Sequence, residues 1–142
     1  MFLGEYEYRI DNKGRLPLPP KFRQELRDGL VLTRGAEEFI ALYPSSEWQK
    51  LADSLASRNM TPSKLRKLNR IIFGAAFSLT LDGQGRIALP SSLREYAQII
   101  DAATIIGANN CIELWNPNQW NSEKVSAEEQ AWQIIESLES QQ

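Results

Sequence analysis

The pattern of apolar and polar residues predicts a chain of short strands and helices. Charged and apolar side chains alternate in EYEYRI at residues 5–10, as expected of a strand with one buried face. The pentad DNKGR at 11–15 follows, and its Gly14 suits the positive φ of a tight turn. A short strand, RLPL, then leads to a helix that begins at a proline and carries Phe22 and Leu26 one turn apart. Pro17 and Pro19 confine that strand to a sheet edge or to a strand end.

The same order of elements occurs twice. RIDNKGRLPLPPKFR at 9–23 aligns without a gap with TLDGQGRIALPSSLR at 80–94. After one inserted residue, VLTRGAEEFIALYPSSEW at 31–48 aligns with ATIIGANNCIELWNPNQW at 103–120, and each stretch predicts two strands around a glycine hairpin. The chain is therefore an internal duplication. Neither copy has enough strands to bury its own apolar face, so we expect the copies to pack about a pseudo-two-fold axis as a small interlocked barrel.

Two helices are predicted between the copies. The first has Ser45 or Ser46 as its N-cap and places Trp48 on an apolar face with Leu51 and Leu55. The second begins at Thr61–Pro62, with an apolar face formed by Leu65, Leu68, Ile72 and Phe73. Its other side is basic and carries Lys64, Arg66, Lys67 and Arg70.

A C-terminal helix is predicted after the second copy. Ser126 and Glu129 have the spacing of a capping box, and Trp132, Ile135 and Leu138 form an apolar stripe. The stripe has no evident place in the duplicated core, so docking on a neighbouring subunit is one role for it. The predicted organisation is an α+β chain with a first repeat at 1–47, connecting helices at 48–74, a second repeat at 75–121 and a helical tail at 122–142.

Composition excludes several classes of protein. The chain has 142 residues, which suits one domain or two very small units that share a core. It has no histidine, which removes Ser-His-Asp and Cys-His nucleophiles and histidine-ligated zinc, and we expect neither a metal nor a cofactor. Cys111 is the single cysteine and is expected to be a small buried strand residue. A lone cysteine, no membrane-length apolar run and two glutamates in the first ten residues indicate a cytoplasmic protein.

The net charge of −2 hides an uneven distribution of charge along the chain. Residues 1–80 hold 13 Lys/Arg and 9 Asp/Glu, whereas residues 81–142 hold 3 and 9. The first copy concentrates cations around its turn, namely Arg9, Lys13, Arg15, Lys21 and Arg23, with Asp11 as the single acid among them. Nucleic-acid binding depends on such a local field rather than on the overall charge.

The two turns share an aspartate four residues before an arginine: Asp11 with Arg15, and Asp82 with Arg86. A protein of the aspartic-protease type would need one carboxylate to stay protonated, and a guanidinium beside each carboxylate opposes this. The aspartates can instead accept backbone N–H groups and structure their turns. An arginine held beside a carboxylate is also oriented to meet a phosphate or a guanine edge, which favours a binding surface over a merely solvated one.

Taken together, these motifs resemble the bacterial MraZ family. The residues that carry the resemblance are MFLGEYEYRIDNKGRLPLPPKFR at 1–23, LYPSSEW at 42–48, NRIIFGAAFSLTLDGQGRIALPSSLR at 69–94 and IELWNPNQW at 112–120. The resemblance ends near residue 122 and leaves the tail unconstrained. It implies two fused copies of the AbrB/SpoVT DNA-binding domain, which is a swapped-hairpin β-barrel.

The resemblance also implies a function and a set of site residues. A protein of this family would be a sequence-specific regulator, largely a repressor, of the division and cell-wall gene cluster, bound to direct repeats in double-stranded DNA upstream of its own gene. It would form a closed, octamer-like ring and associate with the nucleoid. The DNA-binding residues would be Lys13, Gly14 and Arg15 in the first copy and Gln84, Gly85 and Arg86 in the second, with Asp11 and Asp82 structuring the loops. Family members vary at the position of Gln84.

Two alternatives to the DNA-binding regulator remain open at the level of sequence. A structural ring or scaffold protein would not need the basic loop and should ignore duplex DNA even at low salt. An antitoxin-like module would bind DNA through the same loop and bind a toxin through the tail helix, whose apolar face at Trp132, Ile135 and Leu138 is compatible with that role.

Overall fold

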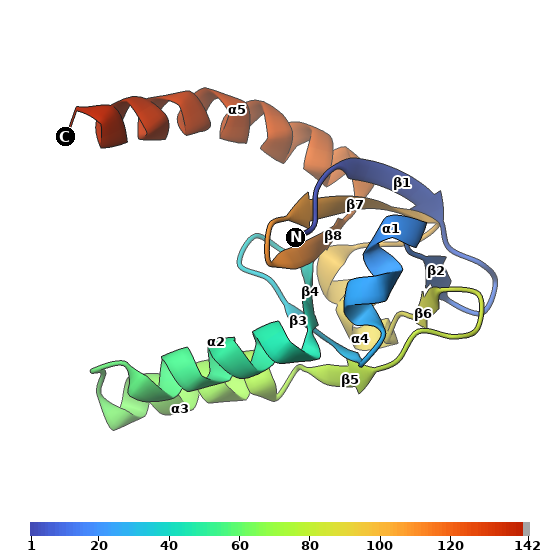
Figure 1. Cartoon of the computed structure of the whole chain (residues 1–142), viewed down its shortest axis with the longest axis horizontal. Helices are drawn as coiled ribbons and strands as arrows, with labels where there is room; N and C mark the ends of the chain where they lie inside the picture. The colour runs from blue at the N-terminus through green and yellow to red at the C-terminus, as the bar shows by residue number, and fades with distance from the viewer. Residues whose placement is uncertain (141–142) are drawn as a thin grey trace.

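The computed structural model describes residues 1–140 and shows an α+β fold, which confirms the predicted class (Figure 1). A six-stranded antiparallel sheet forms its centre, with the strand order β1-β7-β8-β4-β3-β5. The strands of the first copy are β1 (Glu5–Arg9), β3 (Leu30–Arg34) and β4 (Ile40–Pro44), and those of the second are β5 (Phe77–Leu79), β7 (Ala102–Ala108) and β8 (Cys111–Trp115). Exchanging each strand for its counterpart in the other copy gives the same order read backwards. The sheet therefore has the predicted pseudo-two-fold symmetry.

Each copy contributes its first strand to the sheet edge of the other copy. Strand β1 pairs with β7, and β5 pairs with β3. The two short strands, β2 (Arg15–Pro17) and β6 (Arg86–Ala88), pair with each other as a separate antiparallel ribbon. The Leu18 N–H donates to the Gly85 carbonyl at 3.1 Å, and the Leu89 N–H donates to the Gly14 carbonyl at 2.9 Å. The copies are thus interlocked through backbone hydrogen bonds.

The core lies between the sheet, the ribbon and two short helices. These helices are α1 (Pro20–Arg23), which continues as the 3₁₀ turn η1 (Gln24–Leu26), and α4 (Ser91–Ala97). Leu16 and Ile87 at the centre of the ribbon have no exposed surface. The predicted helix residues are also buried in this core: Phe22, Leu26, Leu93 and Ala97. Burying an aliphatic or aromatic side chain of this kind contributes about 1.5–3 kcal/mol, so the shared core favours the interlocked state over separate copies.

The two connecting helices form an antiparallel pair. Helix α2 spans Ser45–Ser57, and α3 (Pro62–Leu68) ends in a single π-helical turn, η2 (Asn69–Phe73). The Trp48 ring, in the first turns of α2, meets the Phe73 ring at the end of η2 edge-on at 5.1 Å. The predicted cap at Thr61 is confirmed, because its hydroxyl accepts the Lys64 N–H.

The predicted serine cap of the preceding helix is wrong. Helix α2 already includes Ser45 and Ser46, and its N-cap residue is Pro44. Among the described residues, no side chain makes a capping hydrogen bond at this end of the helix. The Ser45 N–H donates to the Gly29 carbonyl at 3.2 Å, so the residue before β3 satisfies one of the four N–H groups that the start of the helix leaves unpaired.

The C-terminal helix begins nine residues earlier than the predicted capping box at Ser126. Helix α5 runs unbroken from Pro117 to Glu139. The Asn116 side chain accepts the N–H groups of Asn118 and Gln119, and Pro117 takes the first helical position. Ser126 lies inside the helix, where its hydroxyl accepts a hydrogen bond from the Gln130 side chain. The box prediction failed because a stronger cap exists upstream.

Helices α2 and α5 are counterparts in the duplication. The Tyr43 and Trp48 rings lie 5.7 Å apart with a 53° tilt, and the Trp115 and Trp120 rings lie 5.5 Å apart with a 56° tilt. On the outer face of the sheet, Trp115 also stacks on Phe39 at 5.1 Å. This second apolar cluster includes Trp120 of α5, and its Tyr43 contacts Trp48 of α2, so it lies beside the starts of both helices.

The predicted glycine hairpins and the predicted burial of Cys111 both differ in detail from the structure. In the hairpins, the residues with a left-handed backbone are Glu38 (φ 63°) and Asn109 (φ 70°), and not a glycine. Gly107 is required instead by close approach, since a Cβ there would overlap the backbone of Phe2 and Leu3. Cys111 is in a strand as predicted but is only partly buried, and that burial raises the pKa of its thiol.

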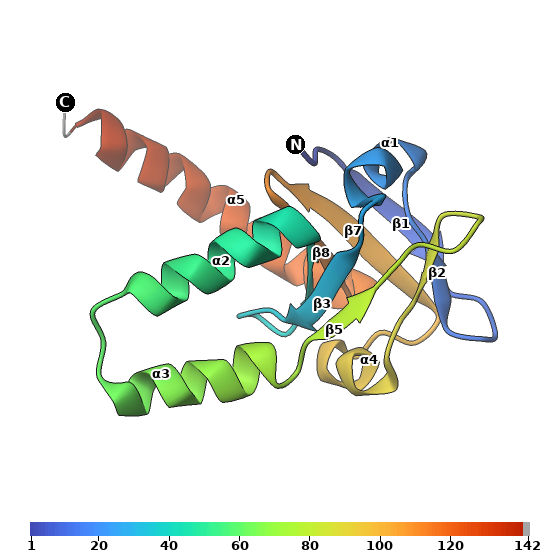
Figure 2. The same cartoon turned by 60° about the horizontal axis from the view of Figure 1, so that its bottom comes forward.

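Helices α2, α3 and α5 lie on the opposite side of the molecule from the two Asp-x-x-Gly loops. In both views, α2, α3 and α5 extend away from the sheet on one side, while the β1–β2 and β5–β6 loops project on the other (Figures 1 and 2). Within residues 1–140, no helix is both long enough and apolar enough to cross a membrane. The loops are thus presented clear of the helical end of the chain.

Candidate nucleic-acid interface

The first loop is organised by the carboxylate of Asp11. Its Oδ1 accepts the backbone N–H groups of Lys13 and Arg15, both at 2.9 Å. Its Oδ2 accepts the Arg15 Nε–H at 2.7 Å, and the Gly14 N–H donates to the Asp11 carbonyl at 3.0 Å. The Asp11 carboxylate therefore bonds both the backbone of the turn and the side chain of Arg15.

The second loop repeats this geometry nearly atom for atom. Asp82 Oδ1 accepts the N–H groups of Gln84 and Arg86 at 2.9 Å, and Oδ2 accepts the Arg86 Nε–H at 2.8 Å. Gly14 and Gly85 have φ angles of +76° and +74°, which a residue with a Cβ rarely adopts. The repetition shows that the Asp-x-x-Gly-Arg motif encodes one local structure, twice.

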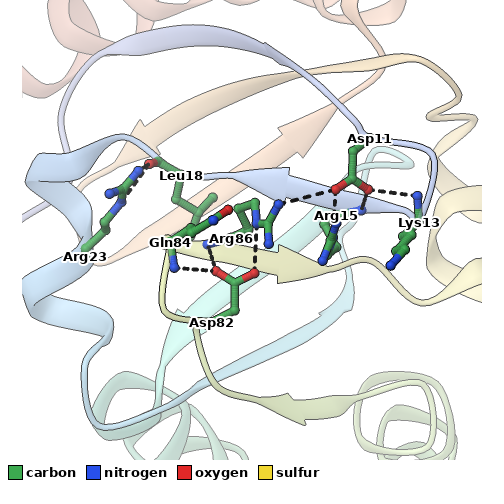
Figure 3. A network of polar contacts seen from close by, with 8 residues as sticks. All are labelled: Asp11, Lys13, Arg15, Leu18, Arg23, Asp82, Gln84 and Arg86. Atoms are coloured by element: carbon green, nitrogen blue, oxygen red, sulfur yellow. Dashed lines mark hydrogen bonds and ion pairs between the residues drawn. The ribbon is translucent and has the colours of Figure 1, made fainter.

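The β2–β6 ribbon brings the two arginines to one face. In a strand, alternate residues point to opposite sides, and Leu16 and Ile87 point into the core. Arg15 and Arg86 therefore share the solvent side of the ribbon (Figure 3). Arg86 Nη1 also lies 3.6 Å from Asp11 Oδ2, an ion pair between the copies that the sequence does not reveal.

The predicted site residues thus form one surface built from both copies. Lys13 and Gln84 lie at the two loop tips with exposed side chains. Arg15 and Arg86 are partly buried on the ribbon, and their side chains have 32% and 22% of their surface exposed, so each is held yet still reachable. Nε of each arginine donates to its own aspartate, and Nη1 of Arg86 also lies near Asp11. Nη1 and Nη2 of Arg15 and Nη2 of Arg86 make no hydrogen bond within residues 1–140 (Figure 3). Such a pre-oriented fork suits recognition of a phosphate or a guanine.

Other cations of the predicted basic cluster have structural roles. Arg23 donates from Nε and Nη2 to the Leu18 carbonyl at 3.1 and 3.0 Å. Its guanidinium also packs directly under Gly85, where a Cβ would overlap it. Lys21 Nζ lies 5.1 Å above the centre of the Tyr6 ring, a cation–π contact. Sequence alone could not separate these roles from ligand binding, because all these residues appear as one charge run.

The turn hydrogen bonds also set the charge state of the loops. The Arg15 N–H, the Arg15 guanidinium and the Lys13 N–H lower the pKa of Asp11 to about 2, against an opposing effect of desolvation. The Arg86 N–H is the main cause of the lowered pKa of Asp82. Both carboxylates therefore remain ionised at neutral pH, which is incompatible with a proton-sharing acid pair.

We expect the Asp11 carboxyl to titrate with a midpoint of about 2, rather than near its ordinary value of 3.8. Because the pKa is lowered in the folded loop, the stabilising effect of the ionised carboxylate is complete above pH 3.8 and is lost as the pH falls through about 2. Carboxyl-detected NMR of the wild type, with Asp11→Asn to assign the signal, measures the midpoint. A midpoint near 3.8 would show that the turn hydrogen bonds are absent in solution.

The described residues contain no group of three or more His, Cys, Asp or Glu side chains arranged to hold a metal ion. The arrangement that the two copies do build is a rigid ribbon with two pre-oriented arginines, flanked by two projecting loop tips. The chain is thus a fused pair of small α+β units that share one core and one loop-bearing surface.

Comparison with known proteins agrees with this architecture. The family described as "MraZ protein, putative antitoxin-like" matches the chain twice, at residues 1–71 and 72–137. Proteins called "Transcriptional regulator MraZ" are similar over nearly the whole chain: one from Dehalococcoides mccartyi strain BAV1 is 51% identical over 140 residues, covering 98% of this chain and 99% of that protein. One from Halothermothrix orenii is 43% identical over 139 residues, covering 98% and 97%. One from Roseiflexus sp. strain RS-1 is 44% identical over 122 residues, covering 86% and 85%.

The chain belongs to the MraZ family. The resemblance carried by the two Asp-x-x-Gly-Arg motifs is thereby confirmed. Each family match contains one Asp-x-x-Gly-Arg motif and extends into the helical segment that follows its copy.

Proposed function

We propose that this protein is a sequence-specific, double-stranded DNA-binding transcription regulator. The observation that carries the proposal is the shared face of Arg15 and Arg86, each oriented by its own aspartate and both on one exposed ribbon. Membership of the MraZ family and the name of the curated relatives, "Transcriptional regulator MraZ", support the same role. We also propose that the fold is two fused AbrB/SpoVT-type domains, for which the exchanged edge strands and the paired ribbon are the supporting features.

In the proposed complex the loops enter the DNA groove and the flanking groups hold the backbone. Arg15 reads a guanine, because a fixed guanidinium can donate two parallel hydrogen bonds to its O6 and N7 atoms. Lys13, at the first loop tip, contacts a phosphate. Arg86 and Gln84 make the corresponding contacts from the second loop, with Gly14 and Gly85 allowing the backbone to approach closely. Asp11 and Asp82 position the arginines and do not touch DNA.

One chain offers few cations, so we propose that several chains act together in a closed, octamer-like ring. The exposed stripe on α5 supports self-association: Trp132, Ile135 and Leu138 have 68%, 43% and 58% of their surface exposed. The acidic α5 and the basic α3 also have complementary charges. A ring that presents the same loops repeatedly converts weak contacts into avidity on DNA direct repeats of matching spacing. The targets we propose are repeats upstream of its own gene, with repression of the division and cell-wall cluster and a cytoplasmic, nucleoid-associated location.

An antitoxin-like role is the second candidate, because the family description includes that term and α5 presents an unpartnered apolar stripe. In that role the loops would bind DNA in the same way, while α5 would bind a toxin in place of a second copy. Light scattering of the purified chain separates the two, since a ring has a multiple of the 16.2 kDa chain mass without any partner.

A fluorescence-anisotropy titration tests the proposed function directly. We expect tight binding to the DNA upstream of the protein's own gene and much weaker binding to a shuffled duplex. If each subunit neutralises about two phosphates and three or four subunits engage, the logarithm of affinity should fall with the logarithm of salt with a slope of roughly −5 to −7. Equally weak binding to both duplexes would favour a scaffold protein whose loops serve the ring alone.

A further inference from the structure

The two loop tips differ in charge, and the structure places a compensating charge beside the weaker one. Lys13 at the first tip corresponds to the neutral Gln84 at the second. Because the copies are interlocked, the end of α1 and η1 from the first copy lies against the second loop, as the packing of Arg23 under Gly85 shows. One turn further on, Arg27 corresponds in the duplication to the neutral Gln98. Thus the copy that lacks a cation at its own loop tip faces a helix end that has one.

A surface concavity of about 550 Å³ joins these elements. It is lined by Arg23, Arg27, Asp82, Gly83 and Gly85, among others, so it combines two guanidiniums of the first copy with the loop of the second. A Cβ added at Gly83 would have no other atom within 4 Å, which leaves room for a ligand beside the turn.

The guanidiniums in this concavity retain unused donors. Arg23 uses Nε and Nη2 for the Leu18 carbonyl, and its Nη1 has no hydrogen-bond partner among residues 1–140 (Figure 3). Arg27 is exposed, and its side chain makes no hydrogen bond or ion pair within that part of the chain. The Asp82 carboxylate, in contrast, is already occupied by the Gln84 and Arg86 N–H groups and the Arg86 guanidinium. Two acids are close to Arg27 in sequence: Glu25 is bound by the N-terminal ammonium, and Asp28 is exposed.

The corresponding region beside the first loop is built differently, although Arg94 Nη1 also packs against Gly14. Arg94 donates from Nη2 to the Ile100 carbonyl at 2.9 Å rather than to the carbonyl equivalent to that of Leu18. Gln98 Oε1 accepts a hydrogen bond from the Gln119 side chain at 2.7 Å, which ties it to α5. The concavity formed by Arg94 and Gln98 includes no residue of the first loop. The cationic concavity is therefore a feature of the second loop.

We propose that Arg27, together with Arg23, binds a DNA backbone phosphate beside the second loop and supplies the cation that Gln84 lacks. The inference rests on the proposed function and adds a contact to it. A planar guanidinium pair suits a tetrahedral oxyanion, and a phosphate contact positions the protein without reading sequence. Arg27 is thus a positioning residue for DNA, contributed by one copy to the loop of the other.

The test compares single and double variants of the full chain by anisotropy titration against the native repeats and a shuffled duplex, across a salt series. Arg27→Gln removes the cation from an exposed position, so the fold should persist. We expect affinity for both duplexes to fall by the same factor, about tenfold at moderate salt, and the salt slope to become shallower by about 0.9 for each engaged subunit. Adding Gln84→Lys to Arg27→Gln should restore most of the loss, since it returns a cation to the same loop.

Arg58→Gln is the matched control, because it removes one exposed positive charge at the far end of α2, away from the loops. An equal loss in Arg58→Gln would mean that bulk charge, not a local contact, explains the effect, and would overturn the assignment. If Arg27→Gln bound DNA with the same affinity and salt slope as the wild type, the phosphate contact at Arg27 would also be overturned. The proposed function would still stand in that case, provided that the wild type binds the native repeats specifically. A wild type that ignores duplex DNA even at low salt would remove both proposals together.

Discussion

Replacing Arg15 by alanine is expected to abolish the preference for the native repeats while leaving the assembly state unchanged. The Arg15 guanidinium donates to Asp11 and is partly exposed, and β2, which carries it, lies on the opposite side of the molecule from the C-terminal part of α5 (Figure 1). A bidentate arginine–guanine pair contributes about 1–3 kcal/mol of discrimination, which is roughly five- to 150-fold in affinity for each engaged loop. Because several subunits engage at once, the losses multiply and the preference should disappear.

The measurement is an anisotropy titration of Arg15→Ala against native and shuffled duplexes, with light scattering to follow assembly. Arg15→Lys serves as the matched variant, because it keeps the charge but loses the planar fork. We expect Arg15→Lys to retain most of the weak binding to shuffled DNA and to lose the preference. Unchanged preference in Arg15→Ala would mean that the ribbon face does not read bases.

Replacing Gly85 by alanine is expected to lower the free energy of unfolding by about 2–3 kcal/mol. An L-residue in the left-handed region costs roughly 1–2 kcal/mol, and Gly85 has a φ of +74°. The new Cβ would also overlap the Arg23 guanidinium and displace it from the Leu18 carbonyl. Strain at one glycine therefore breaks a contact between the two copies as well as the turn itself.

Gly83→Ala is the control for this effect, because it lies in the same loop with no atom within 4 Å of its added Cβ. Chemical denaturation of both variants compares their free energies of unfolding, and we expect Gly83→Ala to stay within about 0.5 kcal/mol of the wild type. Equal stability of the two variants would indicate that the second loop rearranges freely and is not locked to Arg23.

The local structure of the loops follows from the sequence because its causes are local. An aspartate, a glycine and an arginine within five residues are enough to predict the turn at Asp11 and the orientation of Arg15. The pseudo-symmetry follows from the duplication for the same reason. The Asp11–Arg86 pair and the packing of Arg23 under Gly85 could not be predicted from the sequence. Both contacts depend on how the strands of one copy pair with those of the other, and no short-range sequence pattern specifies that pairing.

The start of α5 follows from the duplication rather than from the local capping pattern. The duplication aligns Trp120 with Trp48, and the sequence predicts a helix that begins near Ser45 and carries Trp48. Transferring that helix to the second copy places its start near Pro117, where the structure has it. The Ser126–Glu129 spacing was a weaker local pattern that helix propagation from Asn116 overrides.

The unequal loops on a pseudo-symmetric ribbon give the molecule a direction. A dimer of identical chains presents the same tip at both ends and reads a duplex equally well from either side. Here the two halves are covalently joined, so each could change independently, and Lys13 now lies at one end where Gln84 lies at the other. If the loops bind DNA as proposed, the chain distinguishes the upstream from the downstream side of its site. Operators with a fixed orientation, rather than palindromes, are the natural match for such a protein.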